Sequence, residues 1–293
     1  IARELDFDLL LTGHQHMPVE SVRIGGTFAV QPPANAGRYL QVEAAVRDGG
    51  AEFSARLLPV GGIHREQPYR RLLPLEQAAQ RWLDEPVGHL EQAIPPEEKL
   101  RAALHGSAVA ALFNQVQLSH TGADISCTSL GNEPAGLAAS VTMRAITAAY
   151  LFSNTLVVLE ITEEILRALL ERCASYFTLE NGTPRVSDAF LAPKVEHYNY
   201  DFFAGISYQF DLRQPVGRRL TRLSRLDGTP LGPGPLRLCT SNYRATGTGG
   251  YDALRTCPVL WRGSVEMPEL VAEYVRANSP VSLPCNGRME AIW

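Results

Sequence analysis

The sequence has no excess of positive charge and no long apolar run. Its 293 residues contain 27 lysines and arginines against 31 aspartates and glutamates, a formal net charge of −4. A nucleic-acid surface needs a basic face, so we expect no nucleic-acid partner. The longest apolar runs, AVAALF and LVVLEI, are far shorter than the roughly 20 residues that cross a bilayer, so we expect no membrane span.

Cysteine is scarce and scattered. The five cysteines are Cys127, Cys173, Cys239, Cys257 and Cys285, and no C-x-x-C pair occurs. This spacing favours buried free thiols over a structural zinc site, and the odd number argues against a disulfide framework.

The first 62 residues have the pattern of short strands. The opening IARELDFDLLLTG predicts the end of a helix followed by a buried strand at 8–11, so we expect the chain to begin inside a domain. Alternating runs bounded by Gly and Pro then predict antiparallel strands, with a tight turn at DGG, residues 48–50. The stretch HREQPYRRLLP, residues 64–74, predicts a linker.

From Leu75 onward the apolar spacing becomes helical and then mixed. Two helical stretches are expected over 75–94 and 96–118, with Glu97 and Glu98 near the start of the second. Strands are expected at ADISCTS, LVVLEI, GISYQFDL, LTRLSRLDG and PLRLCTSN; helices are expected at VTMRAITAAY, at TEEILRALLERCASYF and over 268–277. Thr162 is expected to cap the helix that follows it. This mixture predicts the α+β class.

Two histidines separated by one residue, His14 and His16, follow the first predicted strand and Gly13. On a loop after a strand, both imidazoles can turn toward one centre, and neutral imidazole suits zinc, manganese or iron. A bare H-x-H pair is a weak signal, but the strand and glycine before it make it similar to the G-H-x-H signature of calcineurin-like metallophosphoesterases.

Four further stretches strengthen that resemblance: SAVAALFNQVQLSHTGADISCTSL, VTMRAITAAYLFSNTLVVLEIT, YNYDFFAGISYQFDL and TSNYRATGTGGY. Their order resembles the C-terminal part of the 5'-nucleotidase family, closest to bacterial 2',3'-cyclic-nucleotide 2'-phosphodiesterase/3'-nucleotidases. The resemblance implies the last strands of a metallophosphoesterase sandwich at 1–62, a linker and connecting helix at 63–99, and the 5'-nucleotidase C-terminal, nucleoside-recognition domain at 100–293.

The same resemblance implies a metal-dependent phosphoric ester hydrolase when the protein is full length. Two divalent ions, zinc, manganese or similar, would activate the attacking water, with His14 and His16 among their ligands. The D-x-H, G-D-x-x-D and G-N-H motifs that complete such a centre are absent from the sequence. We therefore expect a fragment with no complete catalytic set, an incomplete metal site and no activity of its own. The family's location implies a periplasmic, secreted or cell-wall protein.

The second domain would bind the substrate, a nucleotide or nucleoside. The resemblance places the nucleobase between Phe152 and Tyr243, with Asn154 as an amide partner and Gly249 in the glycine-rich turn. Gly249 stands where 5'-nucleotidases carry a ribose-facing carboxylate, and Ser126 stands where they carry a phosphate-facing arginine. Both departures favour the cyclic or 3'-nucleotide branch.

Several alternatives stay open on the sequence alone. Phe152 could be an ordinary core residue and Tyr243 a strand-end aromatic. The chain could also be a nucleotide- or partner-binding module that keeps the fold without catalysis. Finally, strands in 1–62 that lack sheet partners predict an exposed edge and self-association through it.

Overall fold

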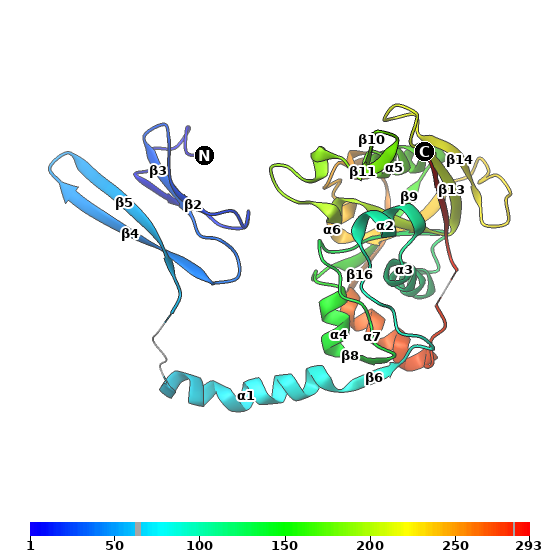
Figure 1. Cartoon of the computed structure of the whole chain (residues 1–293), viewed down its shortest axis with the longest axis horizontal. Helices are drawn as coiled ribbons and strands as arrows, with labels where there is room; N and C mark the ends of the chain where they lie inside the picture. Colours follow the sequence, from blue (N-terminus) through cyan, green and yellow to red (C-terminus); the bar gives the residue numbers. More distant parts are fainter. Residues whose placement is uncertain (62–65, 284) are drawn as a thin grey trace. The chain divides into compact units, whose positions relative to one another are not determined.

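The computed structural model describes residues 1–61, 66–283 and 285–293 (Figure 1). The chain divides into two compact units, Ile1–Pro74 and Leu75–Trp293. Within the described residues, no helix combines the length and apolar character that a bilayer crossing requires.

The first unit consists of strands and the beginning of a helix. Its strands are β1 (Leu9–Leu11), β2 (Val19–Ile24), β3 (Thr27–Gln31), β4 (Arg38–Arg47) and β5 (Gly50–Pro59). Strand β3 is buried along its whole length and lies between β1, to which it is parallel, and β2, to which it is antiparallel. Strands β4 and β5 form a hairpin in which Arg47 lies opposite Gly50, which confirms the predicted turn at DGG.

The linker predicted over 64–74 was wrong for residues 66–74, which belong to helix α1 (Glu66–Asp84). Residues 64–65 lie outside the described residues. Pro74 stands inside the helix and does not end it. The sequence pattern continues across it, because Tyr69, Leu72 and Leu75 keep a three-residue spacing on the helix.

The helix predicted as far as residue 94 ends ten residues earlier, at Asp84. Strand β6 (Pro86–His89) follows and pairs with β8 (Ser140–Thr142). Proline and glycine explain the change, since Pro86 cannot donate in a helical ladder and glycine disfavours a helix interior. Gly88 also allows a close approach, because a Cβ there would lie 2.9 Å from Cγ1 of Val275.

The second unit contains further α-helices and β-strands. They are α2 (Lys99–His105), α3 (Ala108–Thr121), β7 (Ile125–Ser129), α4 (Met143–Ala149), β9 (Thr155–Ile161), α5 (Glu163–Ala174), β10 (Phe177–Glu180), β11 (Thr183–Val186), β12 (Asp201–Ala204), β13 (Ile206–Asp211), β14 (Leu220–Arg225), β15 (Leu236–Ser241), α6 (Asn242–Ala245), β16 (Val259–Glu266), α7 (Met267–Asn278) and β17 (Arg288–Ile292). They include six strands in succession between α5 and α6.

A five-stranded mixed sheet forms the centre of this unit, in the order β12-β7-β15-β9-β16. Helix α3 packs against β7, β12 and β15, and β9 is buried over most of its length. The single helix predicted over 96–118 is two helices, because the chain leaves the helix at Gly106 and restarts at Ser107, whose Oγ accepts from the Ala110 N–H at 3.1 Å. The cap predicted at Thr162 is confirmed.

A second sheet has the order β14-β13-β17, with β13 parallel to β17. The chain passes between the two sheets at Gly205, which has φ +88° and separates β12 from β13. A Cβ at this position would overlap the carbonyl oxygen of Asp124. The arrangement of sheets and helices confirms the predicted α+β class.

We predict that Gly205→Ala destabilises the protein more than Gly182→Ala. Both glycines have positive φ, +88° and +75°, so each alanine costs about 1–2 kcal/mol of backbone strain. At Gly182 the Cβ would meet nothing within 4 Å, whereas at Gly205 it must also displace backbone, which adds about 1–3 kcal/mol. Urea unfolding of the two variants measures the difference, and equal losses would show that the close approach is unimportant.

Candidate functional site

The loop that carries the two histidines is tied at both ends to β3. Thr12 donates through its N–H and its hydroxyl to the Val30 carbonyl, at 2.9 and 3.0 Å. The Gln31 amide accepts from the Thr12 hydroxyl at 3.1 Å and donates to the Met17 carbonyl at 2.6 Å. The loop between these anchors is therefore short and fixed.

His14 and His16 both lie exposed in this loop, with φ of +71° and +60°. Positive φ at two non-glycine residues is uncommon and marks a strained loop of the kind found at ligand sites. In the part of the chain that the structure describes, no group of three or more His, Cys, Asp or Glu side chains could hold a metal ion. The two predicted ligands thus lie in one loop, and within the described residues they belong to no metal-binding group of three or more side chains.

Phe152 lies in the loop between α4 and β9. Its side chain is half-buried and packs against the main core. Its ring makes edge-to-face contacts with Tyr150 and Tyr198, each with a centroid distance of 6.3 Å. Asn154 lies two residues further on; its Nδ2 is 3.4 Å from the Tyr150 hydroxyl, a weak contact, and its Oδ1 has no partner among the described residues.

Tyr243 lies in the short helix α6 with 40% of its surface exposed. Ser241 caps this helix by accepting from the Arg244 N–H at 3.1 Å. The Asn242 side chain accepts from the Thr155 N–H at 3.2 Å, which joins α6 to the start of β9. The loops of Phe152 and Tyr243 therefore meet, although no direct contact joins their two rings in the described chain.

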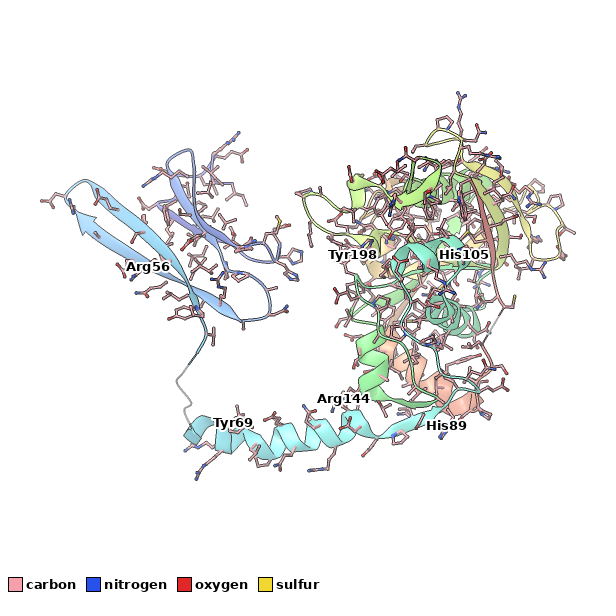
Figure 2. All side chains as sticks on the ribbon, viewed as in Figure 1. Arg56, Tyr69, His89, His105, Arg144 and Tyr198 are labelled. Atoms are coloured by element: carbon pink, nitrogen blue, oxygen red, sulfur yellow. The ribbon has the colours of Figure 1, made fainter. Side chains whose placement is uncertain are left out.

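A third ring, Tyr198, contacts the Phe152 ring and lies at the edge of the second unit (Figure 2). Its hydroxyl donates to Oε1 of Glu196 at 3.1 Å, and Nζ of Lys194 lies 5.6 Å from the ring centroid. Burial, followed by the hydrogen bond to Glu196, raises the pKa of Tyr198 well above the ordinary tyrosine value. The Asn132 side chain donates to the carbonyl of Val195 at 2.9 Å and holds this segment from the other side.

Below the rings lies an ion pair between Arg244 and Asp201, each with a side chain only 2% exposed. The pair is bidentate: Nε of Arg244 donates to Oδ2 of Asp201 at 2.9 Å and Nη2 donates to Oδ1 at 2.8 Å. The guanidinium carbon also lies 4.1 Å from the ring centroid of Tyr251. A planar guanidinium suits both contacts, which a lysine could not reproduce.

The remaining donors of Arg244 reach two other segments. Nη2 donates to the Tyr198 carbonyl at 2.9 Å, and Nη1 donates to the Thr248 carbonyl at 2.6 Å and to Oδ1 of Asn199 at 3.5 Å. Arg244 therefore connects the helix of Tyr243, the segment of Tyr198 and the glycine-rich turn. Its buried charge holds the three segments together.

The structure also locates the two departures noted in the sequence. Gly249 has φ +78°, and a Cβ there would overlap the side chains of Asn199 and Arg244, so the position has no room for a carboxylate. Ser126 is fully buried and donates to Oδ1 of Asn114 at 2.7 Å. Its hydroxyl is therefore occupied inside the core.

Asp201, Arg244, Glu196 and Tyr198 were not assigned any role from the sequence. One signal was available for the ion pair: Asp201 opens an apolar stretch, DFFAGI, and Arg244 directly follows a candidate binding residue. Opposite charges in such apolar surroundings are buried only when paired. Nothing in the sequence pattern indicated that Glu196 and Tyr198 lie near Phe152 and Tyr243.

We predict that Asp201→Asn lowers the free energy of unfolding by about 3–5 kcal/mol, since it leaves the buried guanidinium unpaired. The matched control is Glu290→Gln, which removes the exposed pair with Arg222, with side chains 55% and 67% exposed; a loss of about 0–1 kcal/mol is expected there. Urea denaturation of both variants makes the comparison. Similar small losses in the two would contradict a central role for the buried pair.

Comparisons with known proteins agree with this architecture. Residues 86–256 match the family described as 5'-nucleotidase, C-terminal domain. The chain is similar to the trifunctional nucleotide phosphoesterase protein YfkN of Bacillus subtilis, with 27% identity over 139 residues, 43% of this chain and 9% of that protein. It is also similar to a 2',3'-cyclic-nucleotide 2'-phosphodiesterase/3'-nucleotidase of Haemophilus influenzae, with 23% identity over 258 residues, 76% of this chain and 38% of that protein. The chain thus spans less than half the length of either curated relative.

Solved structures show the same fold over nearly the whole chain. A protein assigned as a 5'-nucleotidase from Staphylococcus aureus superposes with a TM-score of 0.84 and 27% identity, covering 97% of this chain and 56% of that one. The 5'-nucleotidase precursor from Thermus thermophilus superposes with a TM-score of 0.59 and 19% identity, covering 97% and 57%. The family match extends over more than half of the chain, as the sequence resemblance predicted, and the chain belongs to the 5'-nucleotidase C-terminal domain family.

Proposed function

We propose that this chain is the nucleoside-recognition part of a nucleotide phosphohydrolase of the 2',3'-cyclic-nucleotide 2'-phosphodiesterase/3'-nucleotidase or 5'-nucleotidase type. The observation that carries the proposal is the meeting of the Phe152 loop and the Tyr243 helix above the buried Arg244–Asp201 pair. The names of the relatives from Bacillus and Haemophilus support the reaction class. The absence of a carboxylate at Gly249 favours cyclic or 3'-nucleotides.

The proposal divides the chain by role. Residues 1–62 are the C-terminal remnant of a metallophosphoesterase domain, 63–99 are a linker and connecting helix, and 100–293 bind the substrate. Phe152 and Tyr243 offer ring faces to the base, since aromatic faces stack with any base at about 1–3 kcal/mol each. The free Oδ1 of Asn154 is a candidate partner for a donor on the base edge.

The metal site is proposed only as a partial one. His14 and His16 supply two imidazoles, whereas a centre of two divalent ions needs several ligands for each ion. Within the described residues no carboxylate completes the set. The residues present therefore do not fit a complete two-metal centre, and any such centre would need ligands beyond those described in this chain.

A binding module without catalysis is the second candidate function. The packing of Phe152 favours it, because this ring already contacts Tyr150, Tyr198 and the core. A ring braced in this way contributes to the fold as well as to any ligand. We call the rings of Phe152 and Tyr243 the clamp. Measuring both the ligand affinity and the stability of their Ala variants separates the two contributions.

We also propose a location for the protein and a surface for its self-association. The resemblance supports a periplasmic, secreted or cell-wall protein, and one structural neighbour is described as a precursor. In the first unit, Leu11 and Tyr39 border an apolar groove and are 67% and 48% exposed. This groove is consistent with the predicted self-association through the N-terminal strands, which stays a prediction.

We predict that the chain binds adenosine or AMP without metal, and that Tyr243→Ala weakens binding about five- to 150-fold, which corresponds to about 1–3 kcal/mol for a lost stack. Since Tyr243 is substantially exposed, the melting temperature of the Tyr243→Ala variant should change little. Phe152→Ala should lower both affinity and stability, because that ring also packs against the core. Calorimetry and thermal melts measure the two properties. Tyr69→Ala is the matched control, as Tyr69 lies outside this site with 55% exposure; unchanged affinity in the Tyr243 variant would contradict the clamp.

We also predict negligible phosphodiesterase turnover by residues 1–293 alone, because two imidazoles cannot hold the metal centre that the reaction needs. The assay uses bis-p-nitrophenyl phosphate and 2',3'-cyclic AMP with added zinc or manganese. The double variant His14→Ala/His16→Ala is the control for trace hydrolysis. Metal-dependent turnover that the double variant loses would show that the chain carries a working centre.

A further inference from the structure

A chain of polar side chains runs outward from the buried ion pair to the rings. The Asn199 side chain lies between Arg244 and Glu196: its Oδ1 accepts from Nη1 of Arg244 at 3.5 Å, and its Nδ2 donates to Oε2 of Glu196 at 3.0 Å. A guanidinium can only donate and a carboxylate can only accept, so these neighbours fix the orientation of the amide. Asn199 therefore links the buried charge to Glu196, with a weak contact on the Arg244 side and a normal hydrogen bond on the Glu196 side.

Glu196 is held from its other side as well. Its Oε1 accepts from the Tyr198 hydroxyl at 3.1 Å, and its main-chain N–H donates to the Phe190 carbonyl at 2.8 Å. No lysine, arginine or histidine forms an ion pair with this carboxylate within residues 1–61, 66–283 and 285–293. Each carboxylate oxygen can accept two hydrogen bonds, so the half-buried side chain keeps acceptor positions for another donor.

This acceptor lies among the rings of the proposed clamp. Tyr198, which donates to Glu196, contacts the Phe152 ring at 6.3 Å, and the carbonyl of Tyr198 accepts from Arg244, the residue after Tyr243. Burial raises the pKa of both Tyr198 and Tyr243, and the charge of Glu196 adds to the increase in each, while at Tyr243 the charge of Arg244 opposes it. A planar ligand stacked on these rings would place its edge near the carboxylate.

We propose that Glu196 is a specificity-determining residue that accepts a hydrogen bond from the bound nucleoside. The inference rests on the proposed function and adds a ligand requirement to it: the nucleoside must carry a donor at the position that faces Glu196. Two parts of a nucleoside supply such donors, a sugar hydroxyl and an exocyclic amine on the base. Stacking on the rings does not depend on the sugar hydroxyl or the exocyclic amine. Selectivity for a ligand that carries one of these groups must therefore come from a fixed polar acceptor.

The test is a thermodynamic cycle that removes the donor from the ligand and the charge from the protein. The ligands are adenosine, 2'-deoxyadenosine, 3'-deoxyadenosine, 5'-deoxyadenosine and purine riboside, which lacks the amine. Calorimetry gives the affinity of each for the full chain and for its Glu196→Gln and Glu196→Ala variants. The matched control is Glu180→Gln, which makes the same charge change at an exposed ion pair on the β10–β11 hairpin. Thermal melts confirm that each variant is folded.

The full chain should bind one of the four analogues about tenfold or more weakly than adenosine, the expected loss of a hydrogen bond to a charged group. In both Glu196 variants that ratio should fall below about threefold, while Glu180→Gln keeps it. The analogue that shows the effect identifies the donor as hydroxyl or amine. Equal binding of all five ligands by the full chain, or an unchanged ratio in the Glu196 variants, would overturn the inference.

The same experiment separates this inference from the proposed function. If adenosine binds and Tyr243→Ala weakens it, the clamp stands whatever Glu196 does. If adenosine binds normally but Glu196→Gln changes no ratio, only the role of Glu196 is refuted. A full chain that binds no nucleoside would refute both.

Discussion

The buried pair between Arg244 and Asp201 is the interaction on which the rest of the candidate site depends. Removing two charges from water costs several kcal/mol for each ion, and only complete hydrogen bonding offsets that cost. Here all five guanidinium N–H groups have acceptors: the Asp201 carboxylate, the Tyr198 and Thr248 carbonyls and the Asn199 amide. The charge therefore holds three chain segments in one arrangement.

This constraint matters because the rings lie on short connections. Helix α6 has four residues, and isolated helices of that length are unstable in water. Arg244 anchors this helix to the core, Asn242 joins it to β9, and the same guanidinium holds the carbonyl of Tyr198. In the proposed site, the loops therefore present ring faces without first being ordered by a ligand, which would lower the entropy cost of binding.

The sequence predicted more of the fold than of the site. Period-two and helical apolar spacing located the strands of the first 61 residues, β9 and helix α5. A strand or helix that buries one face repeats its apolar residues at a fixed local spacing. The errors at 66–74 and 86–94 arose from proline and glycine, whose effect depends on tertiary partners such as Val275 beside Gly88. The site needed contacts between residues 43 or more positions apart, such as Asp201 with Arg244, and local spacing contains no information on such pairs.

Selectivity in such a site depends on which contacts the ligand makes through its ring faces and which it makes through its polar edges. In the proposed site, Phe152 and Tyr243 would hold any base, since every base has a face to stack, so the rings alone would give a broad substrate range. Side chains with fixed donors or acceptors would recognise the edges of the ligand. Glu196 would be selective because a carboxylate binds a ligand donor and repels a ligand acceptor. Gly249 contributes to this arrangement because it has no side chain. Asn199 and Arg244, which link the buried charge to Glu196, occupy the space that a Cβ would fill. A larger residue at 249 would therefore disturb recognition through the polar chain even without touching the ligand.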